Sequence, residues 1–134
     1  MRPNTVREIW ASGGVALNAW CSIGAPYSAE VLAAAGYDAV TVDLQHGMFG
    51  VDSAIAMLQA ISAQAATPLV RVPALDDAVI MKMLDAGAYG VICPMIDTAA
   101  QAAQLVSACR YPPTGTRSFG PARDRKSTRL NSSH

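Results

Sequence analysis

The sequence has little net charge and no long apolar run, and each shortage argues against a class of protein. Ten lysines and arginines balance ten aspartates and glutamates among the 134 residues. This balance suggests neither nucleic acid nor an anionic membrane surface as a partner. No apolar stretch reaches the roughly 20 residues that cross a bilayer. The polar start Met1–Asn4 also lacks the apolar core of a signal peptide. We therefore expect a cytoplasmic protein.

Cysteine is also scarce, which argues against a disulfide framework. The three cysteines, Cys21, Cys93 and Cys109, are odd in number and far apart, without the spacing of a metal site. We expect them to be buried, reduced thiols. In contrast, 51% of the residues are hydrophobic and only 15% are charged, which suits one ordinary globular core rather than a disordered chain.

The end of the chain differs from the rest in style. Asp124–His134 is polar, without periodicity, and reads as an in-frame translation of a common sequencing-library adapter. We expect this segment to be non-native, with the natural gene cut short after Arg123, and we exclude it from the fold.

Residues 1–123 alternate between apolar runs and amphipathic segments four times. The expected strands are Val15–Cys21, Ala39–Asp43, Pro68–Pro73 and Gly90–Ile96. The expected helix starts are Ser28, Asp52, Asp76 or Asp77, and Asp97, with Gly36 and Gly87 ending the first and third helices. Near-continuous apolar strands separated by such helices predict a parallel sheet.

Four compact strand–helix units correspond to about half of a (β/α)8 barrel. A doubly wound sheet is the competing architecture. The first strand–helix junction, Ser22–Pro26, lacks the G-x-G-x-x-G phosphate fingerprint, and the sequence has no P-loop. We favour an incomplete barrel, although periodicity alone does not separate the two.

Polar side chains follow the second strand, where parallel folds build their active sites. Asp43 ends that strand and His46 lies three residues further on. An imidazole here suits a general base near neutral pH. The alternatives are a histidine that only caps a loop and an aspartate that caps a helix or forms a turn.

Arg71 interrupts the apolar third strand, where a guanidinium is costly unless it meets an anion. Its fork geometry suits a carboxylate or an α-keto acid. The alternative is a buried ion pair with Asp43 on the neighbouring strand.

Two further charged residues lie on the third helix. Asp85 points away from its apolar face and is interpreted as a solvated surface acid. Lys82 is the only lysine before residue 124 and also points outward. An enzyme that makes or breaks carbon–carbon bonds through a Schiff base needs a lysine on or near a strand. Because no lysine is placed in that way here, any carbon–carbon bond chemistry of this chain is expected to use a metal ion instead.

These residues occur within a set of motifs whose order and spacing resemble the 4-hydroxy-2-oxo-heptane-1,7-dioate aldolases, a citrate-lyase-like family. The motifs are Tyr27–Glu30, Gly36–Asp38, Val42–His46, Val70–Pro73, Leu84–Gly87, Pro94–Met95 and Arg110–Arg117. The resemblance covers essentially all of residues 1–123, which would form the N-terminal half of such a protein.

The resemblance implies a (β/α)8 barrel of the phosphoenolpyruvate/pyruvate type, usually assembled as a hexamer. It implies a lyase that cleaves or forms 4-hydroxy-2-oxo acids through a pyruvate enolate, with pyruvate and an aldehyde as small-molecule partners. His46 would be the base, Arg71 would stabilise the enolate, and Asp85 would raise the basicity of the histidine. Asp43 would line the same pocket, and together with Arg71 it would bind substrate.

The resemblance also implies a divalent metal ion, Mg²⁺, Mn²⁺ or Co²⁺, which polarises the keto acid. The family's metal ligands lie on later strands, so we expect no metal ligand in this chain and an inactive fragment of an active parent. Leu44 and Gln45 replace the usual Gly-Glu, which leaves the substrate subclass open. The alternatives are a non-catalytic half-barrel that associates with itself or a partner, and a related citrate-lyase-like, citrate-synthase-like or sugar-acid aldolase.

Overall fold

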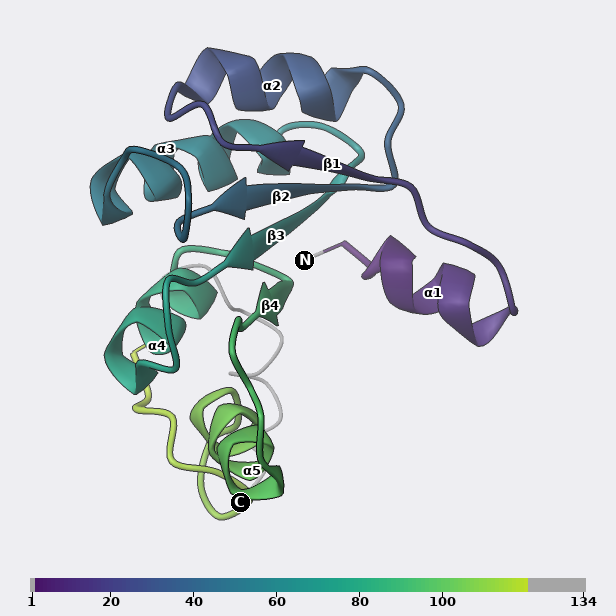
Figure 1. Ribbon diagram of the computed structural model, residues 1–134. Coiled ribbons are helices and arrows are strands. Elements are labelled where there is room, and N and C mark those ends of the chain that lie inside the picture. The colour runs from purple at the N-terminus through teal and green to yellow at the C-terminus, as the bar shows by residue number, and fades with distance from the viewer. Residues whose placement is uncertain (1, 121–134) are drawn as a thin grey trace.

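The computed structural model describes residues 2–120 and contains one parallel sheet. The strands are β1 (Asn18–Cys21), β2 (Ala39–Asp43), β3 (Thr67–Arg71) and β4 (Gly90–Ile92). They lie side by side in chain order, β1-β2-β3-β4, and Figure 1 shows them running in a common direction. The expected parallel α/β fold is therefore confirmed. Closure into a barrel is not seen within these residues, and the expected non-native tail lies outside them.

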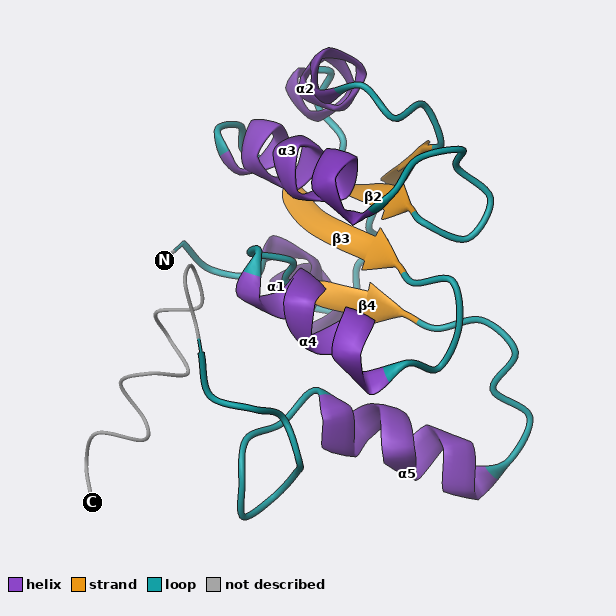
Figure 2. Ribbon diagram, turned by 90° about the vertical axis from the view of Figure 1, so that its left-hand side faces the viewer, coloured by secondary structure: helices purple, strands orange, loops and turns teal. Residues whose placement is uncertain are grey.

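The described helices are α1 (Thr5–Ala11), α2 (Pro26–Ala34), α3 (Val51–Ser62), α4 (Asp77–Asp85) and α5 (Ala99–Ala108). Figure 2 shows α2, α3 and α4 on one face of the sheet, whereas α1 precedes the first strand and lies apart from them. The helices α2, α3 and α4 pack against the strands, whereas α5 packs beside α4. None of the described helices is long and apolar enough to cross a membrane.

The two faces of the sheet differ in chemistry because side chains alternate along each strand. The helix-covered face is apolar and fully buried in its centre; it includes Ala19, Cys21, Val40, Val42 and Val70. The opposite face carries the polar and aromatic residues Asn18, Trp20, Thr41, Asp43 and Arg71. The core therefore lies between the sheet and its helices, and the polar face is left for a site.

Several predicted element ends are confirmed. Asp76 caps α4, because its carboxylate accepts hydrogen bonds from the backbone of Ala78 and Val79. Gly36 and Gly87 follow α2 and α4 with φ angles of 97° and 107°, in the left-handed region that favours glycine. The strand Ala39–Asp43 has the predicted bounds.

Three predicted helix caps are wrong by one to three residues. The cap of α2 is Ala25, not Ser28, because Pro26 has a fixed φ that suits the first turn. The cap of α3 is Gly50, which places Asp52 in the first turn, where its charge suits the helix dipole. The cap of α5 is Thr98 rather than Asp97, because Thr98 completes a capping box with Gln101.

Three predicted strands are longer than, or shifted from, the observed ones. The first strand begins at Asn18 rather than Val15, because pairing with β2 begins only at Asn18, opposite Ala39. The third strand begins at Thr67, one residue before the predicted Pro68, and it ends at Arg71 rather than at Pro73. The fourth strand ends at Ile92, where its pairing with Arg71 ends.

The helix α1 was not expected from the polar N-terminal sequence. Asn4 caps it through a bond from the backbone of Arg7, and Val6 is its one buried residue. The preceding Arg2 donates to the carbonyls of Gln64 and Ala66, just before β3. Tertiary anchoring therefore holds a helix of only seven residues, a length that is marginal in isolation.

The cysteines are free thiols, as predicted. Cys21 is buried, whereas Cys93 and Cys109 are only half-buried, so their burial is less complete than expected. Burial raises the pKa of all three thiols above the ordinary value.

Candidate active site

Asp43 and Arg71 meet at the ends of two neighbouring strands. They are register partners at the last position of β2 and β3, so both side chains leave the sheet on the same face. Arg71 donates through Nε to Oδ1 of Asp43 at 2.9 Å and through Nη2 to Oδ2 at 2.7 Å. The structure thus forms the ion pair that the sequence left open as one alternative for Arg71.

The Asp43 carboxylate accepts six hydrogen bonds, three at each oxygen. Besides Arg71, Oδ1 accepts from the backbone N–H groups of Gln45 and His46 at 3.0 and 3.3 Å. Oδ2 accepts from the Trp20 indole at 3.0 Å and from the Ser22 hydroxyl at 3.1 Å. This set of donors uses the full capacity of a carboxylate. The side chain is only 1% exposed, so Asp43 is covered.

The hydrogen bonds from Arg71 hold the pKa of Asp43 far below its usual range. The Trp20 indole and the two backbone N–H groups act in the same direction with smaller effects, and together with Arg71 they outweigh the opposite effect of burial on the pKa. The same pairing raises the pKa of Arg71. The pair is therefore ionised at neutral pH, and the lowered pKa makes the Asp43 carboxylate a weak base.

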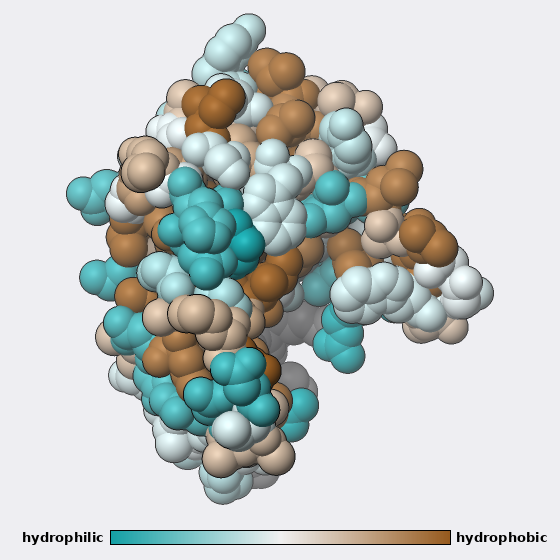
Figure 3. Space-filling view, in the orientation of Figure 1, coloured by the Kyte–Doolittle hydropathy of each residue, from teal (hydrophilic) through white to brown (hydrophobic). Residues whose placement is uncertain are grey.

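Arg71 retains donors for a second anion. Asp43 occupies the fork formed by Nε and Nη2, while the fork formed by Nη1 and the second Nη2 proton makes no hydrogen bond within residues 2–120. The guanidinium carbon lies 4.8 Å from the centre of the Trp20 ring, and the side chain is 21% exposed. Figure 3 shows hydrophilic side chains gathered over the ends of β2 and β3. This edge of the sheet therefore presents a cation.

His46 belongs to the loop that follows β2, and its backbone is tied to the same carboxylate. The His46 backbone nitrogen and Arg71 Nε share one acceptor atom, so the two residues lie at the same edge of the sheet. The side chain of His46 is exposed. Gly47 makes this tight turn possible, because a Cβ there would collide with the Asp43 carbonyl oxygen and the Phe49 ring.

Asp85 lies elsewhere. It is the last residue of α4, which leads from the end of β3 back toward the start of β4, so it lies near the starts of the strands, whereas His46 follows the end of β2. Its Oδ1 accepts a hydrogen bond from Arg117 Nη2 at 2.7 Å, and its side chain is 29% exposed. Asp85 is therefore a partly exposed acid, as the helix face predicts, but it is paired with Arg117 rather than fully solvated. Lys82, as predicted, is exposed.

Three residues of these clusters were not identified from the sequence. Trp20 and Ser22 donate to Asp43, and Arg117 binds Asp85. A signal existed for the first two, because period-two alternation places them on the face opposite Cys21. No comparable signal pointed to Arg117, which lies 32 residues from Asp85 in sequence.

The part of the chain that the structure describes does not fit the divalent metal that the resemblance implies. Residues 2–120 contain no group of three histidine, cysteine, aspartate or glutamate side chains placed to hold a metal ion. The nearest carboxylate to the edge, Asp43, has its oxygens committed to six donors. A metal ion would therefore need ligands from beyond these residues.

Comparisons with known proteins match this arrangement to one family. The model of the HpcH/HpaI aldolase/citrate lyase family matches residues 17–132. The chain is 47% identical over 120 residues to a hydroxypyruvate/pyruvate aldolase of Rhizorhabdus wittichii, covering 90% of this chain and 48% of that protein. It is 43% identical over 121 residues to a 4-hydroxy-2-oxovalerate aldolase of Rhodococcus jostii, covering 90% of this chain and 47% of that protein.

Solved structures agree with the sequence matches. An HpcH/HpaI aldolase/citrate lyase family protein from Burkholderia cenocepacia superposes with a TM-score of 0.85 at 31% identity, covering 97% of this chain and 56% of that one. The citrate synthase SbnG superposes with a TM-score of 0.82 at 32% identity, covering 92% and 50%. The chain spans about half the length of the curated relatives it matches. With its family resemblance confirmed, the chain belongs to the HpcH/HpaI aldolase/citrate lyase family.

Proposed function

We propose that residues 1–123 are the N-terminal half of a (β/α)8-barrel aldolase and supply its keto-acid binding edge. The observation that carries this proposal is the free fork of Arg71, held at a strand end by a buried and saturated carboxylate. Such a fork matches the planar carboxylate of an α-keto acid, bound through two parallel hydrogen bonds.

The residues of this chain take distinct roles in the proposed reaction, the cleavage or formation of a 4-hydroxy-2-oxo acid through a pyruvate enolate. Arg71 binds the keto-acid carboxylate and stabilises the negative charge of the enolate and the alkoxide. His46, in the adjacent loop, takes the proton from the hydroxyl group during cleavage, directly or through a water molecule. Asp43 acts through Arg71 by holding its guanidinium.

In this proposal the remaining parts of the site come from the other half of the barrel and from a neighbouring copy of the chain. The divalent ion, Mg²⁺, Mn²⁺ or Co²⁺, takes its ligands from the other half of the barrel. Asp85 lies at the far edge of its own sheet, so it reaches His46 only from a neighbouring copy in a homo-oligomer, for which we propose a hexamer. The chain alone is then inactive, and the parent is a cytoplasmic enzyme.

A chimera tests this function. Residues 1–123 replace the matching half of the Rhizorhabdus wittichii aldolase, and pyruvate release from a 4-hydroxy-2-oxo acid is measured with added Mg²⁺ or Mn²⁺. We expect activity in the chimera and none in the 134-residue chain. Arg71→Lys lowers kcat/KM about 100-fold, because a single point charge replaces the fork. His46→Gln lowers kcat about 100-fold or more.

The matched control is Arg110→Lys, at an exposed arginine far from the strand ends, which should leave activity within about twofold. The proposal fails if the chimera is folded and oligomeric but Arg71→Lys is as active as Arg110→Lys. Pyruvate release by the 134-residue chain alone would contradict the part of the proposal that assigns the metal ligands to the other half.

A second activity of the same family is favoured by one observation. The citrate synthase SbnG is as similar to this chain in identity as the Burkholderia protein, at 32% against 31%. Condensation of an oxo acid uses the same carboxylate clamp. Assaying the chimera with oxaloacetate and an acyl thioester, beside pyruvate and a panel of aldehydes, separates the two activities.

A further inference from the structure

Trp20 contacts both members of the Asp43–Arg71 ion pair. Its indole N–H donates to Oδ2 of Asp43 at 3.0 Å, and its ring lies under the Arg71 guanidinium, 4.8 Å from ring centre to Cζ. Ser22 supplies a second donor to the same oxygen at 3.1 Å but has no contact of this kind with the guanidinium. Trp20 therefore constrains the anion and the cation together.

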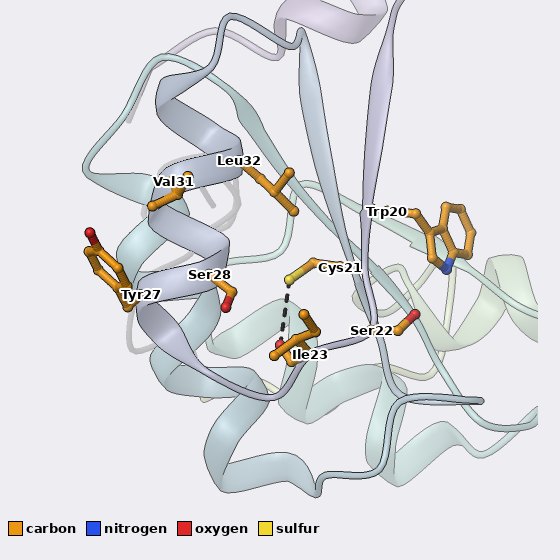
Figure 4. A pocket seen from close by; sticks show the side chains of 8 residues that line it. All are labelled: Trp20, Cys21, Ser22, Ile23, Tyr27, Ser28, Val31 and Leu32. Atoms are coloured by element: carbon orange, nitrogen blue, oxygen red, sulfur yellow. Dashed lines mark hydrogen bonds between the residues drawn. The ribbon is translucent and has the colours of Figure 1, made fainter.

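The position of Trp20 on β1 explains how one side chain reaches both ions. Trp20 pairs with Thr41 on β2, so Asp43 lies two residues further along the same face of the neighbouring strand. Figure 4 shows the indole on the opposite side of β1 from the Cys21 thiol, which points toward α2 and the apolar cavity of about 400 Å³ there. Trp20 is 44% exposed, yet its N–H is bonded to a buried carboxylate.

These contacts fix the orientation of the Arg71 guanidinium. Asp43 holds one edge of the planar group, and its central carbon lies over the indole ring. The remaining edge, with Nη1, then has a defined direction. A guanidinium that is held in advance loses less conformational entropy when an anion binds.

We propose that Trp20 is the positioning residue of the Arg71 anion clamp. The indole keeps Asp43 and Arg71 in register, so the free fork stays directed at the opening where a keto-acid carboxylate binds. This inference rests on the proposed function for the identity of the anion, but the orienting role of Trp20 does not depend on it.

The test uses the full 134-residue chain, with oxalate and pyruvate as probes. The sequence holds two tryptophans, and the other, Trp10, is exposed on α1, so Trp10→Phe is the matched control. Oxalate affinity is measured by calorimetry for the unmodified chain and for Trp10→Phe, Trp20→Phe, Trp20→Leu and Ser22→Ala. In the Trp10→Phe background, the emission of Trp20 should also change when oxalate binds.

We expect Trp20→Phe, which keeps an aromatic face but loses the N–H, to weaken oxalate binding about threefold. Trp20→Leu loses both contacts and should weaken it about tenfold. Ser22→Ala removes one donor to the same oxygen and should match Trp20→Phe rather than Trp20→Leu. Trp10→Phe should bind like the unmodified chain. Equal affinity in Trp20→Leu and Trp10→Phe overturns the proposal and leaves the proposed function intact.

A second measurement decides the role of Trp20 without any ligand. The exchange rate of the Arg71 Nε proton with water, measured by nitrogen-15 NMR, reports how firmly the guanidinium is held. We expect it to rise about tenfold in Trp20→Leu and to be unchanged in Trp10→Phe. If oxalate binds none of the variants, the proposed anion site fails, and an unchanged exchange rate in Trp20→Leu then overturns the positioning role as well.

Discussion

Two aspartate–arginine pairs of the same length stabilise this molecule, but their burial is reversed. The Asp43–Arg71 and Asp85–Arg117 pairs each have an N–O distance of 2.7 Å. Each guanidinium also lies over an aromatic ring, Trp20 at 4.8 Å and Tyr111 at 4.5 Å. In the first pair the carboxylate is 1% exposed and the arginine 21%, whereas in the second the arginine is 3% exposed and the carboxylate 29%.

The reversal shows that similar ion pairs can present opposite charges. The first pair buries its anion and leaves a cation at the end of the strands, where a carboxylate can bind. The second pair buries its cation and leaves a carboxylate oxygen of Asp85 at the end of α4. The partly exposed member, not the pair itself, determines what each cluster can recognise.

The largest difference between the pairs should appear when each carboxylate is replaced by an amide. Asp43→Asn places an NH₂ group among donors and leaves Arg71 without its counter-charge, so we expect a loss of about 3–5 kcal/mol in the free energy of unfolding. Urea unfolding followed by circular dichroism measures the loss. Asp97→Asn, at an exposed aspartate before α5, is the control and should change stability by less than about 0.5 kcal/mol.

Acid should weaken the first pair gradually. Because the folded state holds the pKa of Asp43 far below the usual range, the carboxylate stays charged in the folded chain after it is protonated in the unfolded chain. Its contribution is fully present above the ordinary aspartate pKa near 4 and is lost as the pH falls toward the lowered value, by roughly 1.4 kcal/mol per pH unit. Urea unfolding at pH 5, 4 and 3 should show the Asp43→Asn cost shrinking in this way. A constant cost across this range would contradict the lowered pKa.

The second pair should be less costly to break. In Asp85→Asn the amide oxygen can still accept the bond from Arg117 and the exposed side stays hydrated, but the buried guanidinium loses its counter-charge. We therefore expect a smaller loss than for Asp43→Asn, about 2 kcal/mol. The same urea measurement applies. If Asp85→Asn costs as much as Asp43→Asn, the burial of the carboxylate does not decide the stability of these pairs.

The smallest expected difference between the two pairs is in how the stability cost of each substitution depends on salt. Raising NaCl from 0.05 to 1 M shortens the screening length to about 3 Å and acts mainly on exposed charges. The cost of Asp85→Asn should then fall by a few tenths of a kcal/mol, whereas the cost of Asp43→Asn should hardly change. Parallel salt series on both variants check this. An equal response of the two variants would show that both carboxylates are equally shielded from solvent.

The sequence predicted the sheet well because its signals are local. Apolar runs identified all four strands, and Asp76, one of two candidate starts, and Gly87 marked the ends of α4. Helix caps were shifted where two candidates compete within a few residues, as with Asp97 and Thr98. The α1 helix was missed because its stability comes from contacts with residues about 60 to 85 positions away, such as that of Arg2 with Gln64.

The site was predictable only in part, because some of its contacts join residues far apart in the sequence. Asp43 and Arg71 could be paired in advance because parallel strands bring their ends together. The helix-face argument placed Asp85 away from the core, but no local pattern connects it to Arg117 in the segment after α5. The position of His46 after β2 indicated a base from the sequence, whereas the role proposed for Asp85 comes from the resemblance alone.

The convergence of three donors on one oxygen has a consequence for signalling within the site. Oδ1 of Asp43 accepts from Arg71 Nε and from the backbone of Gln45 and His46. A ligand that draws the guanidinium outward removes one of the three donors from this oxygen, so it also changes the hydrogen bonds of the two amides. Occupancy of the clamp and order in the histidine loop are thereby thermodynamically linked, and the amide resonances of residues 45 and 46 should register an anion that they never touch.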